Sequence, residues 1–165
     1  MGEYDIPDVQ AHAGVIEAGI PNAKREIISN SGHLIPLEQP KAFNGAIKKF
    51  LADLRFYKVL NSEGVDAAVK YFHNKKEIEP DIELFDESEM NKFGYQFLQK
   101  GKIKDAIKLF KLNTIAYPES ANAYDSLGEA YLKDNQKELA IENYKKSLEL
   151  NPNNTNAQKV LNDLR

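Results

Sequence analysis

A pattern that recurs every 34 residues constrains this chain more than any other feature of its sequence. Counted from Glu87 and from Ala121, small residues and prolines recur in register, with aromatic or apolar residues between them. The matching pairs are Met90/Tyr124, Phe93/Leu127, Gly94/Gly128, Phe97/Tyr131, Ala106/Ala140, Phe110/Tyr144 and Pro118/Pro152. A period of this length is typical of solenoid folds, in which each unit is one supersecondary element that packs on its neighbours.

The residue types within each unit predict two antiparallel helices. Apolar residues in the first half fall at helical spacing and form a stripe. Gly94 and Gly128 lie in the middle of this helix, where glycine costs about 1 kcal/mol relative to alanine. We therefore expect the second helix to approach closely at each glycine, with Ala106 and Ala140 facing that contact.

The helix boundaries are also readable from the sequence. Proline removes an N–H group and restricts the residue before it, so Pro118 and Pro152 predict the ends of the second helices. Asp86 followed by Glu89 is a variant of the capping box and predicts a helix start at residue 87.

These two units resemble the tetratricopeptide repeat. The resemblance covers residues 87–154 as two full units, and the segment 155–165 is similar to the polar capping helix of such arrays. Upstream, residues 62–79 echo the second helix of a repeat and predict a degenerate half-repeat within a connecting segment, 56–86. The resemblance implies a function in protein interaction.

In tetratricopeptide-like arrays, fixed positions of the first helices line a concave groove that can bind a peptide. The residues at these positions are Ser88, Asn91, Tyr95, Leu98, Gln99, Asn122, Asp125, Glu129, Leu132, Lys133, Asn156 and Lys159. Some family members hold an acidic peptide end with basic residues at these positions, but Asp125 and Glu129 would repel it. Peptide binding, packing within or between copies of the chain, and a merely solvated face are the alternatives.

Residues 1–55 have a different character, with glycine, proline and histidine separating short elements. Residues 9–18 read as a helix, 24–29 as a strand and 39–54 as a second helix. The order helix, strand, helix predicts a small αβα piece of a parallel sheet.

Two short motifs in this segment, GEYD near the start and SGHLIPLEQP after the strand, resemble the C-terminal end of the α/β-hydrolase fold. In that family a strand ending in G-x-x-D presents the acid of the catalytic triad, and a G-H turn followed by E-x-P presents the histidine. The resemblance assigns Asp5 to the acid and His33 to the general base, in the family's chain order. It covers only the last quarter or so of such a domain.

A hydrolase also needs an activated nucleophile and oxyanion donors. The sequence has no G-x-S-x-G motif: Ser126 lacks the first glycine and lies in a repeat helix, while Ser29 and Ser31 follow the acid. We therefore expect Asp5 and His33 to be vestigial and the chain itself to be inactive. It is either the C-terminal portion of a serine esterase-type hydrolase whose nucleophile lies upstream, or a truncated product that keeps the tail of that fold.

A lone strand at residues 24–29 would expose its backbone N–H and C=O groups, together with Ile27, Ile28 and Ile35. One solution is pairing with the same strand of a second copy, which would make a homodimer. The alternatives are that residues 1–35 fold onto the repeats or stay disordered.

Composition excludes several function classes. The 22 basic residues are outnumbered by 25 acidic ones, and the net charge of −3 gives no basis for binding nucleic acid. No apolar run approaches the ~18–20 residues needed to span a bilayer. No signal peptide is evident, so a cytoplasmic location is the default expectation. With no cysteine and three scattered histidines, we expect neither metal nor cofactor.

The sequence therefore predicts a mostly α fold: a tetratricopeptide-like hairpin array with a small N-terminal αβα remnant of a hydrolase sheet. The expected domains are 1–55, 56–86 and 87–165. The expected function is that of a non-catalytic protein-interaction or scaffold module that binds a protein or peptide.

Overall fold

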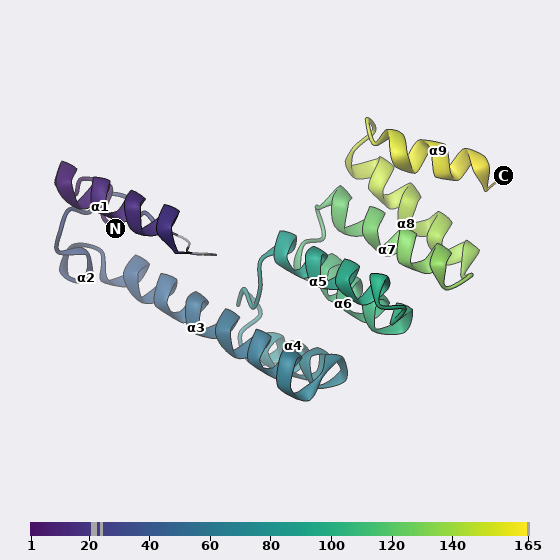
Figure 1. Ribbon diagram of the computed structural model, residues 1–165, viewed down its shortest axis with the longest axis horizontal. Helices are drawn as coiled ribbons and strands as arrows, with labels where there is room; N and C mark the ends of the chain where they lie inside the picture. Colours follow the sequence, from purple (N-terminus) through teal and green to yellow (C-terminus); the bar gives the residue numbers. More distant parts are fainter. Residues whose placement is uncertain (21–22, 24, 165) are drawn as a thin grey trace. The chain divides into compact units, whose positions relative to one another are not determined.

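The computed structural model describes residues 1–20, 23 and 25–164, and it divides into two compact units, Met1–Ala52 and Asp53–Arg165. Most of the described residues are helical (Figure 1).

The second unit is a series of antiparallel helix pairs with a terminal helix. Helices α5 and α6 pack together, as do α7 and α8; α6 also contacts α4 and α7, and α9 packs on α8 (Figure 1). The helices are the last turns of α3 (Pro40–Glu63), then α4 (Val65–Ile78), α5 (Glu87–Gln99), α6 (Ile103–Ala116), α7 (Ala121–Lys133), α8 (Lys137–Leu150) and α9 (Thr155–Asp163). The predicted helical-repeat array is therefore confirmed.

Side-chain caps set the start of each first helix. The Asp86 carboxylate accepts hydrogen bonds from the N–H groups of Ser88 and Glu89, at 2.9 and 3.3 Å. The side-chain oxygens of Ser120 and Asn154 accept from the N–H group three residues later, at 3.2 and 3.1 Å. Each cap satisfies backbone donors that the helix leaves unpaired, which explains why α5, α7 and α9 begin where they do.

The mid-helix glycines make room for an aromatic ring of the second helix. A Cβ on Gly94 would lie 2.4 Å from the Phe110 ring, and one on Gly128 would lie 3.1 Å from the Tyr144 ring. The close approach predicted from the sequence is confirmed. The three atoms nearest to each Cβ belong to that ring, and Ala106 and Ala140, which we expected to face the contact, are fully buried in the same core.

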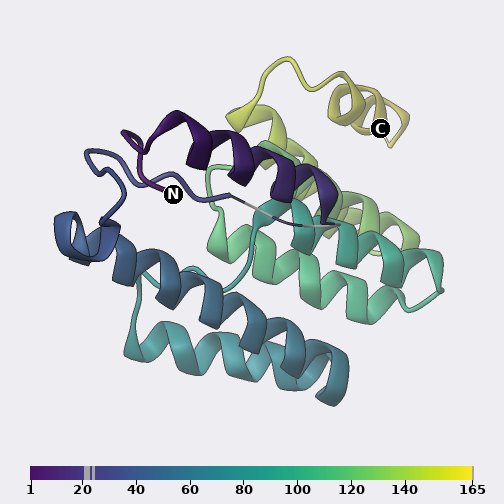
Figure 2. The same ribbon diagram turned by 60° about the vertical axis from the view of Figure 1, so that its left-hand side comes forward.

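Aromatic rings join the last turns of α3 to α4 and to Phe85, which lies just before the repeats. The ring of Phe56 in α3 lies 6.5 Å from that of Tyr71 in α4 and 5.0 Å from that of Phe85. Phe72 of α4 stacks on Phe85 at 5.6 Å. The last turns of α3 therefore lie beside α4 as a helix pair (Figure 2), so α4, which covers the predicted half-repeat, has a helix of its own to pack against.

The first unit contains α1 (Pro7–Gly19), α2 (Ile35–Glu38) and the first turns of α3. Both predicted helices, 9–18 and 39–54, are present. The predicted strand is not: residues 25–29 contain only an isolated parallel bridge between Gly2 and Ile28, and Lys24 lies outside the described residues. The prediction of an αβα sheet remnant was therefore wrong, because a single bridge with two backbone hydrogen bonds makes no ladder.

Apolar side chains of the first unit are mostly uncovered. Ile28, which we expected to be exposed, is its one buried hydrophobic residue among those described, at 8% exposure. Ile27 is 50% exposed, in line with the prediction. Among the described helices of the whole chain, none combines the length and apolar character needed to cross a bilayer.

Candidate functional site

Helices α5, α7 and α9 carry the residues that the sequence assigns to the groove. We call the face that they present the first-helix face. Its members are Asn91, Tyr95, Gln99, Asn122, Asp125, Glu129, Lys133, Asn156 and Lys159. Four of these nine side chains contact one another between helices, as the pairs Tyr95–Glu129 and Asp125–Asn156.

Tyr95 links α5 to α7. Its hydroxyl donates to the Glu129 carboxylate at 3.0 Å and lies 3.3 Å from the Ser126 hydroxyl. Burial raises the pKa of Tyr95 to about 12, and the charge of Glu129 adds to that rise. The phenol of Tyr95 therefore stays protonated at neutral pH and donates its hydrogen bond to the Glu129 carboxylate.

Asp125 links α7 to α9. Its carboxylate accepts from the Asn154 amide at 2.8 Å and from the Asn156 amide at 3.0 Å. Asn154 is also the residue that caps α9. One carboxylate of α7 thus ties down the first turn of the terminal helix.

A third link joins the starts of α5 and α7. The Glu87 carboxylate accepts from the Ser120 hydroxyl at 2.6 Å and from the Asn122 amide at 3.3 Å. Glu87 and Asn154 were not among the predicted groove residues. Asn154 is the cap of α9 and Glu87 is the first residue of α5, so the signal that could have found them is their place at the start of a first helix, beside the neighbouring unit of a stacked array.

These three links, at Tyr95, Asp125 and Glu87, show that side chains of the first-helix face help to hold the helices together. The two acids expected at its centre already accept hydrogen bonds from within the chain. Leu98, also predicted for the groove, belongs to the buried core at 9% exposure. Gln99 and Lys159 are exposed, and Lys133 lies 3.5 Å from Glu129 as an exposed pair.

A hollow beside the second hairpin, of about 550 Å³, lies mainly over α8 and not on the first-helix face. Tyr124 of α7 lines it with Ile141 and charged residues of α8. It is a mixed polar and apolar depression that the sequence pattern did not indicate.

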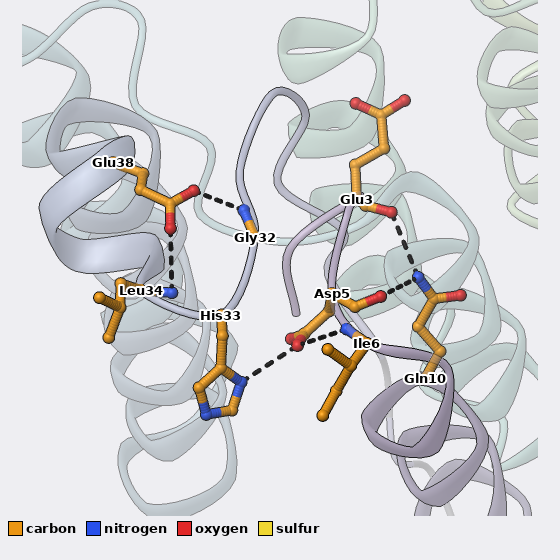
Figure 3. A network of polar contacts seen from close by, with 8 residues as sticks. All are labelled: Glu3, Asp5, Ile6, Gln10, Gly32, His33, Leu34 and Glu38. Atoms are coloured by element: carbon orange, nitrogen blue, oxygen red, sulfur yellow. Dashed lines mark hydrogen bonds and ion pairs between the residues drawn. The ribbon is translucent and has the colours of Figure 1, made fainter.

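In the first unit, the structure brings together the two residues that resemble triad members. Asp5 Oδ1 lies 3.0 Å from His33 Nδ1 (Figure 3). The Asp5 side chain is 4% exposed, whereas that of His33 is 68% exposed. A buried carboxylate therefore holds one ring nitrogen, and the other nitrogen lies on the side of the ring away from Asp5 (Figure 3).

The turn that carries His33 is attached at several points. Glu38 accepts from the N–H groups of Gly32 and Leu34, at 2.5 and 3.2 Å (Figure 3). The Tyr4 N–H donates to the Ser31 carbonyl at 2.8 Å. Many hydrogen bonds therefore converge on one exposed turn.

Gly2 allows the segment that carries Asp5 to pack against the turn that carries His33. A Cβ at Gly2 would lie 2.0 Å from the carbonyl oxygen of Gly32 and 2.5 Å from that of Ser31. Any other residue would push the histidine turn away from the segment that carries Asp5. The glycine in GEYD therefore has a structural reason beyond its place in the motif.

The buried serine two residues before His33 is not placed to act as a nucleophile for the pair. Ser31 is 1% exposed, and its hydroxyl donates to the Ile28 carbonyl at 2.7 Å, so it does not face the imidazole. In the part of the chain that the structure describes, no cluster of three or more acidic or histidine residues could hold a metal ion. A pocket of about 380 Å³ lies between α1 and α3, with Ile16, Ile28 and Phe43 among its lining residues.

Comparison with known proteins bears on the second unit. The family model described as tetratricopeptide repeat matches residues 121–154. No curated protein matches this chain.

Three solved structures are similar to it. The first TPR of Spaghetti (RPAP3) bound to the HSP90 peptide SRMEEVD has a TM-score of 0.46 at 20% identity, covering 71% of this chain and 90% of that chain. MamA has a TM-score of 0.45 at 23% identity, covering 65% and 60%. The N-terminal domain of stress-induced protein-1 (STI-1) from C. elegans has a TM-score of 0.46 at 14% identity, covering 73% and 96%.

The match to the family model coincides with one structural unit. Residues 121–154 span α7, the turn after it, α8 and the segment that ends in the cap of α9. The tetratricopeptide resemblance of the second unit predicted from the sequence is therefore supported by the family model over residues 121–154.

Proposed function

We propose that the second unit is a protein-interaction scaffold that binds an extended peptide segment of a partner on the first-helix face. The observation that carries this proposal is the continuity of that face. Hydrogen bonds donated by Tyr95 and accepted by Glu87 and Asp125 join the three first helices. A peptide that lies across α5, α7 and α9 would meet one surface whose side chains are already ordered, which lowers the entropy cost of binding.

The charges of this face favour one kind of partner. Asp125 and Glu129 lie at its centre, and their internal partners are neutral amides, a phenol and one exposed lysine. A peptide with an acidic C-terminus would meet like charge there. A segment rich in amide and hydroxyl groups, with a basic residue, would meet complementary charge.

A peptide-display selection against the whole chain tests the proposal. Selected peptides should bind with micromolar affinity and protect α5 and α7 from hydrogen exchange. Changing two members of the face together, Gln99→Ala with Glu129→Gln, should weaken binding at least about tenfold, because the pair removes one polar contact and one of the two central negative charges. The matched control is Glu142→Ala with Lys145→Glu on α8; a larger loss there would place the binding surface over the hollow.

Self-association is the other partner hypothesis. It was predicted through a strand at residues 24–29, and the described residues 25–29 form only one bridge. Light scattering at micromolar concentration tests it: a single species of 18.7 kDa would remove the homodimer.

A second candidate function rests on a separate observation, the hydrogen bond between Asp5 and His33. We propose that this pair is the acid and base half of a serine esterase-type site whose nucleophile lies upstream of Met1 in a longer protein. A buried carboxylate at Nδ1 would keep the proton on that nitrogen and orient the ring. Nε2 would then be available to take a proton from a hydroxyl nucleophile, as a general base does.

Two measurements test this second proposal. The chain alone should not hydrolyse ester substrates, since its sequence has no G-x-S-x-G motif. Reading the gene upstream of the first codon should reveal an in-frame strand, a G-x-S-x-G motif and a helix. If that longer protein hydrolyses esters and keeps its full rate in His33→Ala, the proposal is wrong.

A further inference from the structure

The carboxylate of Glu38 on α2 accepts hydrogen bonds from the backbone on both sides of His33. Glu38 Oε2 accepts the Gly32 N–H at 2.5 Å, and Glu38 Oε1 accepts the Leu34 N–H at 3.2 Å. These two donors belong to the residues immediately before and after His33, as Figure 3 shows. Glu38 does not touch the imidazole itself.

We infer that Glu38 is a positioning residue for His33, acting through the backbone of the turn. The inference rests on the second proposed function, in which the imidazole serves as a base. With 68% of its side chain exposed, His33 gains little position from packing. Asp5 sets the rotation of the ring, but the direction in which the side chain leaves the backbone must be set by the turn.

Glu38 is suited to that task because both its oxygens are used. Hydrogen bonds to an ionised carboxylate are roughly twice as strong as neutral ones, and two of them hold the peptide groups on either side of the Gly32–His33 peptide. The far end of the turn is held separately, by Asn30 donating to Glu3 at 2.9 Å and accepting from Gln39 at 3.1 Å. Catalytic geometry depends on such supporting contacts to within a fraction of an ångström.

The substitution Glu38→Gln isolates this role. Glutamine keeps the shape of the side chain but has one acceptor oxygen, since its NH₂ group only donates. The variant can therefore bond one of the two N–H groups and not both. Glu26→Gln, at an exposed glutamate of the same unit, is the matched control.

The experiment uses NMR on the whole chain with two readouts. Hydrogen exchange of the Gly32 and Leu34 amides reports the contacts of Glu38. Long-range proton–nitrogen correlations report which ring nitrogen of His33 carries the proton. We expect Glu38→Gln to speed exchange of at least one of the two amides about tenfold, and to shift His33 away from the Nδ1–H tautomer. Glu26→Gln should change neither.

The two proposals fail in different ways. If His33 of the unaltered chain carries its proton on Nε2, as the exposed His12 and His73 should, then the pair with Asp5 is absent and the second proposed function fails. If His33 shows the Nδ1–H tautomer and Glu38→Gln preserves it, the pair stands and the positioning role is overturned.

A further variant separates positioning from general disturbance of the turn. Gln39→Ala removes the bond to the Asn30 carbonyl and leaves both bonds of Glu38 in place. We expect it to keep the Nδ1–H tautomer. Loss of that tautomer in Gln39→Ala to the same extent as in Glu38→Gln would overturn the specific assignment.

Discussion

The two units of this chain are ordered by different forces. In the second unit, the described hydrophobic residues form a buried core in which Phe110 and Tyr144 are almost completely enclosed. In the first unit Ile28 is the only described hydrophobic residue that is buried, while Val15, Phe50 and Leu37 are each more than half exposed. What organises the first unit is a set of polar contacts around the acid–histidine pair. Apolar burial dominates folding stability, so the second unit has its own source of stability and the first has little.

The largest test of this comparison is a pair of matched truncations. Phe110→Ala in the second unit should cost about 3–5 kcal/mol of unfolding free energy, because a fully buried ring leaves a cavity. Phe50→Ala in the first unit should change it by less than about 0.5 kcal/mol, because that ring is 59% exposed. Urea unfolding followed by circular dichroism measures both. A large loss in Phe50→Ala would show that something covers this face in solution.

The two mid-helix glycines sharpen the description of the core. Gly94→Ala should destabilise the chain by about 1–3 kcal/mol, because its Cβ would overlap the Phe110 ring and force it to move. Gly128→Ala brings a milder contact with Tyr144, and the helix propensity of alanine offsets it by about 1 kcal/mol. Thermal melts of the two variants should differ clearly. Equal melting temperatures would contradict the difference in the space available for a Cβ beside Phe110 and beside Tyr144.

The link between α7 and α9 predicts a smaller and more local effect. Asp125→Ala leaves the amides of Asn154 and Asn156 without their acceptor, and should cost about 1–2 kcal/mol. The loss should appear first as faster hydrogen exchange in α9. Glu149→Ala, on the exposed face of α8, is the control. Unchanged hydrogen exchange in α9 would mean that Asp125 does not stabilise the packing of α9 and is free to contact a ligand.

The smallest expected effect is a dependence on alkaline pH. Burial raises the pKa of both Tyr95 and Tyr117 to about 12, from an ordinary value of 10. The folded chain keeps these protons where the unfolded chain releases them, so their contribution is complete below pH 10 and is lost as the pH rises toward 12. Melting temperatures should fall over that window, and less steeply in Tyr95→Phe. An equal slope in the variant would exclude Tyr95 as a source.

Much of the array could be predicted because its contacts are local and repeat. Glycine, alanine and proline at a 34-residue period predict hairpins, and Asp86 followed by Glu89 predicts the start of α5, which its cap confirms. Which atoms fill the space beside Gly94 could not be read in the same way. Small residues on two helices suggest a close approach, but only the packed structure shows that the Phe110 ring occupies it.

The groove was harder to predict. The position of a residue in the repeat indicates which face of the helix it lies on, but not which residue it hydrogen-bonds to. Asp125 and Glu129 fall at groove positions, and their charges suggested repulsion of an acidic ligand. Their hydrogen bonds to Asn154 and Tyr95 depend on residues about 30 positions away, whose distance is set by how the hairpins stack. The strand at residues 24–29 failed for a related reason, since a strand exists only where a neighbouring segment completes its ladder.

The sequence by itself determined the helical hairpins, their period and the cap at Asp86, because those depend on residues within one or two turns of each other. It also brought Asp5 and His33 into consideration through the resemblance of their motifs. Only the tertiary structure decided that these two side chains meet, that Glu38 holds the turn carrying the histidine, and that the central acids of the first-helix face are bound within the chain. Those contacts join residues separated by loops or whole helices, and their geometry follows from packing that no local pattern encodes.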